Sequence, residues 1–330
     1  MDTILITGGA GFIGSHLTEY LLEHDENSRV TVIDDLSTGN IKNVKLVQDR
    51  FGEDRVRFIH GRVGEVLGDL SGESFDVIYH LAAMVGVRLI LDEPIRTIET
   101  NVLETADLLR FAQTGASRIL LASSSEVYGK SSAVPFSEGQ DVVYGATTCT
   151  RWSYACTKAI DEYLGLAYHL QFGLPVVVGR FFNTVGPRQI GRYGMVLPRF
   201  IKAALHQEDL EVYDDGSQIR SFCDVRDMVR ALPMLLEREE CYGRVFNVGH
   251  DERISIQHLA ELVIATLGSR SGIRHVSYED AYTAGFEDLA VRQPDLSKLR
   301  EATGFTAKIS LTQTIIDIAE EIRRSETNGE

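Results

Sequence analysis

The chain has 330 residues, of which 44% are hydrophobic and 25% charged, so it can bury one large core or two smaller ones. Its formal net charge of -15 disfavours broad binding to the phosphate backbone of nucleic acid. We find no run of about 18 apolar residues that could span a bilayer and no signal peptide, and the four cysteines lack metal-ligand spacing. We expect a cytoplasmic protein that binds no metal, nucleic acid or membrane.

Short apolar runs rich in β-branched residues predict buried strands at 3–7, 30–33, 56–59, 75–80, 119–123 and 176–181. Helical patterns such as 15–23 and 97–112 lie between them. This alternation predicts an α/β fold with right-handed crossovers and a doubly wound parallel sheet over residues 1–182.

The pattern loosens beyond residue 182, where glycines and prolines are frequent. A strand at 245–248 and helices at 199–206, 256–267 and 311–323 predict a smaller α/β second domain over 183–330. Segments near 218–250 are candidates to rejoin the first domain.

A glycine-rich turn joins the first predicted strand to the first predicted helix, and residues 7–14 read Thr-Gly-Gly-Ala-Gly-Phe-Ile-Gly. Glycine lets a pyrophosphate approach the backbone, and the N–H groups and dipole of a helix N-terminus favour its charge. The turn therefore predicts a Rossmann-type dinucleotide site. Its predicted cofactor-binding residues are Gly8, Gly11, Phe12, Ile13 and Gly14.

Asp34 ends the second predicted strand, twenty residues after Gly14. Its carboxylate can accept hydrogen bonds from both ribose hydroxyls of an adenosine, and its charge would repel a 2′-phosphate. The sequence therefore predicts NAD rather than NADP. Asp35, Thr38 and Gly39 continue the same loop and are predicted to line the cofactor site.

Tyr154 and Lys158 lie four residues apart, on one face of a predicted helix. The ammonium group and the positive nicotinamide ring would both stabilise a phenolate. We therefore expect the pKa of Tyr154 to fall from about 10 toward working pH, so that the phenol acts as a general base. Ser124 and Ser125 follow the strand at 119–123, and their hydroxyls are predicted to bind the hydroxyl being oxidised.

Further motifs are His-Leu-Ala-Ala at 80–83, Val-Tyr-Gly at 127–129, Arg-Phe-Phe-Asn at 180–183, and Asp-Gly-Ser-Gln-Ile-Arg-Ser-Phe at 215–222 with Asp227. Together with the glycine turn and the Tyr154 and Lys158 pair, they resemble extended short-chain dehydrogenases that act on nucleotide sugars. The resemblance covers essentially the whole chain. It implies NAD and a transient 4-keto sugar, formed as Tyr154 takes a proton from the 4-hydroxyl.

The same resemblance implies roles for further residues. Leu81, Ala82, Ala83, Tyr154 and Lys158 would contact the cofactor. Arg220 would clamp the sugar's diphosphate, Asn183 would hydrogen-bond to it, and Arg292 would lie near the sugar or diphosphate. Tyr213 would lie near the nucleobase, with Val85 and Arg192 as further substrate-binding residues. Relatives also imply a homodimer through the helices that carry Tyr154 and Asn101.

Glu126 distinguishes among the reactions of these relatives. Dehydratases of nucleotide sugars carry an Asp-Glu pair there and 4-epimerases a small or apolar residue, whereas Ser125-Glu126 resembles UDP-glucuronate decarboxylase. The resemblance thus implies conversion of UDP-glucuronate to UDP-xylose. The alternative is a 4-epimerase acting on UDP-glucuronate or UDP-glucose, favoured by Met-Val-Gly-Val at 84–87. A 4,6-dehydratase and a non-catalytic NAD-binding protein are less favoured.

Overall fold

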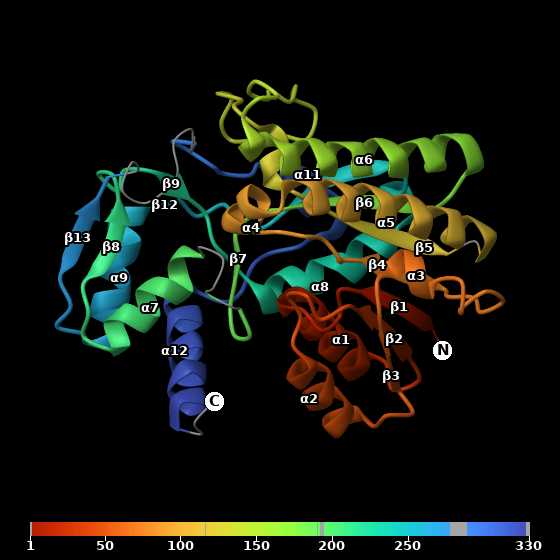
Figure 1. The fold of residues 1–330 in the computed structure, drawn as a ribbon, viewed down its shortest axis with the longest axis horizontal. Helices are drawn as coiled ribbons and strands as arrows, with labels where there is room; N and C mark the ends of the chain where they lie inside the picture. The colour runs from red at the N-terminus through yellow and green to blue at the C-terminus, as the bar shows by residue number, and fades with distance from the viewer. Residues whose placement is uncertain (1, 116, 190, 192–194, 278–288, 328–330) are drawn as a thin grey trace.

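The computed structural model describes residues 2–115, 117–189, 191, 195–277 and 289–327, and a seven-stranded sheet forms its centre (Figure 1). All neighbouring strands in it are parallel, in the order β11-β6-β5-β4-β1-β2-β3. The strands are β1 (Thr3–Thr7), β2 (Arg29–Asp34), β3 (Val56–His60), β4 (Val77–His80), β5 (Arg118–Ser124), β6 (Val176–Phe181) and β11 (Arg244–Val248).

Helices cover both faces of this sheet, because successive side chains of a strand point to opposite faces. In β1, Ile4 and Ile6 pack with α1 (Phe12–His24), α2 (Ile41–Phe51) and α8 (Val225–Leu236), together with α11 (Ser297–Thr303). Leu5 between them packs on the other face with α3 (Val63–Val66), α5 (Pro94–Gly115) and α6 (Ser153–Phe172). The short helix α4 (Val87–Asp92) precedes α5.

A second hydrophobic core lies beyond the sheet and contains residues from 185 onward. It packs α7 (Val196–Leu205), α9 (Ile256–Leu267) and α12 (Leu311–Thr327) against β8 (Leu210–Tyr213), which pairs in parallel with β13 (Ile273–Val276). Two-stranded pairs also form between β7 (Thr184–Val185) and β10 (Cys223–Asp224), and between β9 (Ile219–Arg220) and β12 (Ile254–Ser255).

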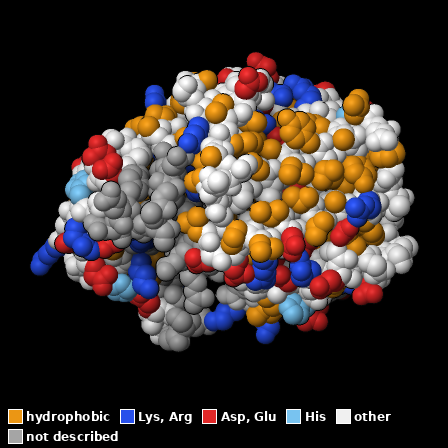
Figure 2. Space-filling model, turned by 45° about the horizontal axis from the view of Figure 1, so that its top comes forward, with side chains coloured by type: hydrophobic (Ala, Val, Ile, Leu, Met, Phe, Trp, Pro, Cys, Tyr) orange, Lys and Arg blue, Asp and Glu red, His pale blue; other side chains and the backbone are white. Residues whose placement is uncertain are grey.

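Apolar side chains are exposed on α5 and α6, which pack against each other (Figure 1). Hydrophobic side chains gather on this part of the surface in Figure 2. They include Ile95, Ile98 and Leu103 on α5, and Ile160, Tyr163 and Leu170 on α6. A contiguous exposed apolar area of this kind is typical of a protein interface.

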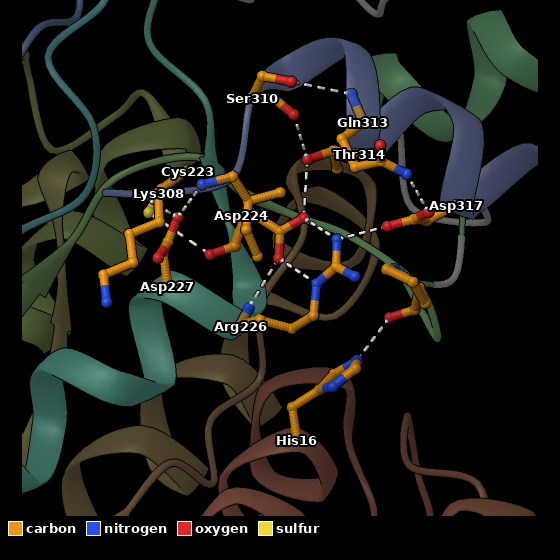
Figure 3. A network of polar contacts seen from close by, with 12 residues as sticks. His16, Cys223, Asp224, Arg226, Asp227, Lys308, Ser310, Gln313, Thr314 and Asp317 are labelled. Atoms are coloured by element: carbon orange, nitrogen blue, oxygen red, sulfur yellow. Dashed lines mark hydrogen bonds and ion pairs between the residues drawn. The ribbon is translucent and has the colours of Figure 1, made fainter. Parts of the chain in front are cut away.

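A polar network holds the C-terminal helix α12 to α8 (Figure 3). Asp224 caps α8 by accepting from the backbone N–H of Arg226, and it also accepts from Thr314 Oγ1 of α12 at 2.7 Å. The guanidinium of Arg226 bridges Asp224 to Asp317. Asp227 accepts two hydrogen bonds from the backbone at 308 and 309, just before α12. The C-terminal helix α12 is therefore fixed to α8, which packs on one face of the central sheet.

The predicted fold class is confirmed, and the six predicted strands match β1 to β6 with small differences in their ends. The strand predicted at 245–248 is β11, which extends the central sheet beside β6. The sequence analysis did not identify α2 and α8 as helices. The boundary at 182 stays a prediction, and α8, β11 and α11 pack in the core of the sheet. In the described part of the chain, every helix is too short or too polar to cross a membrane.

Candidate functional site

One cavity of about 510 Å³ runs along the carboxyl ends of the central strands, where ligands bind in open parallel sheets. It brings together predicted residues that are up to 284 positions apart in the chain, from Gly8 to Arg292. The predicted residues that line it are Gly8, Gly11, Phe12, Ile13, Gly14, Asp34, Asp35, Thr38, Leu81, Ala82, Ala83, Val85, Ser124, Ser125, Glu126, Tyr154, Lys158, Asn183, Tyr213, Arg220 and Arg292. Arg192 lies outside the described residues.

The glycine turn packs so closely against neighbouring backbone that two of its positions cannot hold a side chain. A Cβ on Gly14 would lie 2.3 Å from the carbonyl oxygen of Gly8, and a Cβ on Gly8 would lie 2.8 Å from the backbone nitrogen of Ala82. Gly8 also has a φ of 73°, in the region that favours glycine. No described side chain caps α1 at Gly11, and the first residues of the helix line the cavity, which suits binding of a pyrophosphate.

Asp34 is fixed at the end of β2 by backbone hydrogen bonds. Its Oδ2 accepts from the N–H of Ala10 at 3.0 Å, and its Oδ1 accepts from the N–H of Leu36 at 2.9 Å. Gly39 does not line the cavity but packs behind this carboxylate, since a Cβ there would lie 2.5 Å from Oδ1. The arrangement holds the carboxylate at the cavity wall, where it fits an adenosine ribose.

Tyr154 lies in the first turn of α6 and is only 5% exposed. Burial raises its pKa above 10, the negative charge of Glu126 raises it further, and a hydrogen bond with Ser124 lowers it. The predicted fall in the pKa of Tyr154 is therefore wrong for the chain by itself. The positive charge of Lys158 is paired instead with Asp161, whose Oδ2 lies 3.2 Å from Nζ.

Glu126 is clamped between two arginines. Arg151 Nη2 lies 2.6 Å from one carboxylate oxygen of Glu126, and Arg292 Nη1 lies 2.7 Å from the other. Burial alone would raise the pKa of Glu126, but the charges of Arg292 and Arg151 outweigh burial and lower it to about 2. Glu126 is thus an ionised acceptor that orients two guanidinium groups.

The loop that carries Ser124 and Glu126 is supported from beneath by a second buried ion pair. Glu162 accepts from Nε and Nη2 of Arg180 at 2.9 and 2.7 Å, and from the hydroxyl of Ser123 at 2.5 Å. The guanidinium of Arg180 also lies 4.6 Å from the ring centre of Tyr128. These contacts tie α6 to the ends of β5 and β6.

The residues predicted to bind the nucleotide and diphosphate also line the cavity. Tyr213 accepts a hydrogen bond from Arg199, whose guanidinium also stacks 4.3 Å from the tyrosine ring centre. Arg220 donates to the carbonyl of Leu289 at 2.9 Å, and the amide of Asn183 donates to the carbonyl of Ser221 at 3.0 Å. Each is therefore oriented by the protein, and its role toward a substrate stays a prediction.

Sequence reasoning missed Arg151 and Asp161. Arg151 directly precedes the tyrosine helix, and Asp161 lies three residues after Lys158, so a search for charges one helical turn from the predicted catalytic pair could have found both. Within the described ranges, no three His, Cys, Asp or Glu side chains are grouped so as to hold a metal ion.

Comparison with known families places this geometry among nucleotide-sugar enzymes. The model of the family described as GDP-mannose 4,6 dehydratase matches residues 5–318. A UDP-N-acetyl-alpha-D-glucosaminuronate decarboxylase from Bacillus cytotoxicus is 40% identical over 98% of both chains. UDP-glucuronic acid decarboxylase 6 from Arabidopsis thaliana is 36% identical over 97% of this chain and 88% of its own.

Solved structures show the same fold with other reactions. The UDP-glucuronic acid 4-epimerase from Bacillus cereus, in complex with UDP-glucuronic acid and NAD, has a TM-score of 0.85 and 27% identity, over 98% of this chain and 99% of its own. The dTDP-glucose 4,6-dehydratase DesIV from Streptomyces venezuelae, with NAD bound, also has a TM-score of 0.85 and 27% identity, over 98% of both chains.

Proposed function

The chain belongs to the GDP-mannose 4,6-dehydratase family of nucleotide-sugar enzymes, and we propose that it catalyses the NAD-dependent decarboxylation of UDP-glucuronate to UDP-xylose. The observation that carries this proposal is the buried cluster of Glu126, Arg151 and Arg292. Its two guanidinium groups and one carboxylate carry a formal charge of +1 between them, and each of these side chains is at most 12% exposed.

That excess charge suits an acidic sugar. A buried cation is costly unless an anion compensates it, and a guanidinium binds a carboxylate through paired N–H groups. Nε and Nη1 of Arg151 are buried without a hydrogen-bond partner among the described residues. UDP-glucuronate brings one carboxylate on its sugar, whereas UDP-glucose brings none. The cluster therefore favours a hexuronate over a neutral hexose.

The relatives support the same reaction. Both curated relatives described above are decarboxylases by name, and they match nearly the full chain. The more similar one is named for the 2-acetamido form of the substrate. UDP-N-acetylglucosaminuronate is therefore a second candidate substrate for this chain, with the same carboxylate for the arginine cluster.

The cavity wall fits NAD. The glycines at 8, 11 and 14 let the turn pack closely at the cavity wall, where a Cβ would press on the backbone. The Asp34 carboxylate at the same wall suits an unphosphorylated ribose. Bound NAD supplies a hydride acceptor, and later a hydride donor, beside the sugar. Lys158 and the cavity-lining backbone at 81–83 are the further residues that would hold it.

The chain's own residues divide the proton chemistry among them. Tyr154 takes the proton of the 4-hydroxyl. Ser124 hydrogen-bonds to Tyr154 and so orients the phenol. Once carbon 4 is a ketone, the carboxylate on carbon 5 is β to it, so carbon dioxide can leave as the electron pair moves into the enolate. The two arginines keep Glu126 ionised, so it is no proton donor at working pH, and its task is to hold Arg151 and Arg292.

Product analysis tests this function. The purified protein is incubated with UDP-glucuronate, with UDP-N-acetylglucosaminuronate and with UDP-glucose, with NAD present in each case. We expect release of carbon dioxide and a UDP-linked pentose from at least one uronate. A six-carbon UDP-galacturonate, identified by NMR, would instead assign the epimerase alternative. No turnover of either uronate would refute the proposal.

We also propose that two copies of the chain associate through α5 and α6, whose exposed apolar side chains are described above (Figure 2). Tyr163 is 71% exposed and Ile95 is 72% exposed, which is unusual for large apolar side chains on packed helices. Charged substitutions at both positions should shift the protein from dimer to monomer in sedimentation analysis. A wild-type monomer would refute this assembly. The cytoplasmic location stays a prediction.

A further inference from the structure

The buried carboxylate of Asp161 has no part in the function proposed above. Asp161 lies on α6 three residues after Lys158, and the side chains of the two residues are only 4% and 3% exposed. Oδ2 of Asp161 accepts a hydrogen bond from Nζ of Lys158 at 3.2 Å. The ammonium group of Lys158, which is predicted to act on the cofactor and on Tyr154, is therefore also held by Asp161.

A chain of polar groups continues from Asp161 into the sheet. Burial raises the pKa of Asp161, whereas Lys158 and Thr105 on α5 lower it. The hydroxyl of Thr105 donates to the carbonyl of Asn101 and lies 3.0 Å from Nε2 of His80. Nδ1 of His80 lies 2.7 Å from the hydroxyl of Thr7, at the end of β1. Burial and the charge of Lys158 lower the pKa of His80 to about 3, so this imidazole is neutral. The network thus adds no positive charge that could replace Lys158 as the partner of Asp161.

We propose that Asp161 is a positioning residue that anchors the ammonium group of Lys158 and offsets its charge beside Tyr154. The inference rests on the sugar-oxidation step of the proposed function and does not depend on the fate of the carboxylate.

The other charged groups around α6 are already paired. Glu162 is bound by Arg180 from β6, and Glu126 is bound by Arg151 and Arg292. Lys158 and Asp161 therefore form a separate pair on α6, which packs against α5, β5 and β6. Because a buried charge left alone is costly, each member depends on the other.

This pairing affects the base. The negative charge of Asp161 raises the pKa of Tyr154, in addition to the effect of burial. Removing the charge while keeping the shape leaves the Lys158 ammonium uncompensated near the phenol, which favours the phenolate. Asp161→Asn should therefore lower the pKa of Tyr154, whereas loss of a purely structural contact would not.

The first test is the pH profile of kcat/KM for whichever nucleotide sugar the NAD-loaded protein turns over. In Asp161→Asn, the acid limb, where activity rises as Tyr154 ionises, should move to lower pH by about one unit. Asp161→Ser removes the same charge and should also move the acid limb to lower pH. Asp161→Glu keeps the charge and should leave the acid limb near its wild-type position. An unchanged limb in folded Asn and Ser variants would overturn the proposal.

The second test needs no activity. Lys158→Met leaves Asp161 as an unpaired buried carboxylate, so this variant should lose thermal stability. Adding Asp161→Asn to Lys158→Met should recover about 5 °C of the melting temperature. If the losses of the two single variants simply add, the pair is not coupled and the proposal is wrong. A protein that turns over no nucleotide sugar would refute the proposed function and leave this stability test valid.

Discussion

The excess positive charge beside Glu126 gives a prediction about substrate choice. The cluster carries one net positive charge, which Arg151→Met reduces to zero and Glu126→Gln increases to two. Loss of Arg151 should weaken binding of UDP-glucuronate, because the sugar carboxylate loses a guanidinium partner. Binding of UDP-glucose should change little. Glu126→Gln should bind UDP-glucuronate at least as tightly as the wild type does.

The magnitude follows from Coulomb's law. One unit charge at about 5 Å, with an effective dielectric constant of about 20, contributes about 3 kcal/mol. This energy corresponds to about 100-fold in the dissociation constant of UDP-glucuronate, since about 1.4 kcal/mol is a factor of ten. A smaller loss is expected if water enters the space left by the Arg151 side chain.

The assay is calorimetric binding of both nucleotide sugars in a Tyr154→Phe background, which blocks turnover. Arg270→Met is the matched control, because Arg270 is exposed and does not line the cavity, so its loss should leave both affinities unchanged. The reasoning is refuted if Arg151→Met weakens the two sugars equally. It is also refuted if Glu126→Gln weakens UDP-glucuronate as much as Arg151→Met does, since both would then act by disturbing the cluster.

Three further predictions concern the cofactor site and the buried network. Gly14→Ala should reduce NAD affinity by at least ten-fold, because its Cβ would lie 2.3 Å from the Gly8 carbonyl oxygen; fluorescence titration with NADH measures this. Asp34→Ser should narrow the preference for NAD over NADP, and an unchanged ratio of the two dissociation constants would contradict the role of the carboxylate. His80 has a pKa of about 3 in the folded protein and about 6.5 when unfolded, so the unfolded chain takes up the proton first as pH falls. Its stabilising contribution is complete above pH 6.5 and declines below it. The destabilisation caused by His80→Asn should therefore be about 2 kcal/mol smaller at pH 5 than at pH 7 in urea unfolding, and an equal destabilisation at both pH values would contradict the lowered pKa.

Local patterns identified residues for the predicted cofactor site that the structure brings into one cavity. The glycine turn and Asp34 lie within one strand-helix-strand unit, where spacing along the chain determines position in space. The same holds for Tyr154 and Lys158, which are one helical turn apart. These residues line one cavity, because strands of a parallel sheet bring their carboxyl ends to a single edge.

The electrostatics of the site could not be predicted from local patterns. Glu126 meets Arg151 and Arg292, which are 25 and 166 positions away, so their pairing depends on the tertiary fold. The expected effect of Lys158 on Tyr154 ignored Asp161, which pairs with the ammonium, and also ignored burial. By contrast, the strand at 245–248 and the return of segments near 218–250 to the first domain were expected, and β11 pairs with β6 while α8 packs on the sheet.

The arginine cluster links recognition of an acid to the chemistry of the base. Arg151 lowers the pKa of Tyr154, and Glu126 raises it. A sugar carboxylate bound to the cluster would compensate the excess charge that favours the phenolate, so binding of an acidic sugar and ionisation of Tyr154 oppose each other. Asp161 also disfavours the phenolate of Tyr154, because it offsets the positive charge of Lys158. A related epimerase and a related dehydratase have the same fold, so the number and sign of these buried charges, rather than the scaffold, are what would adapt this site to a hexuronate.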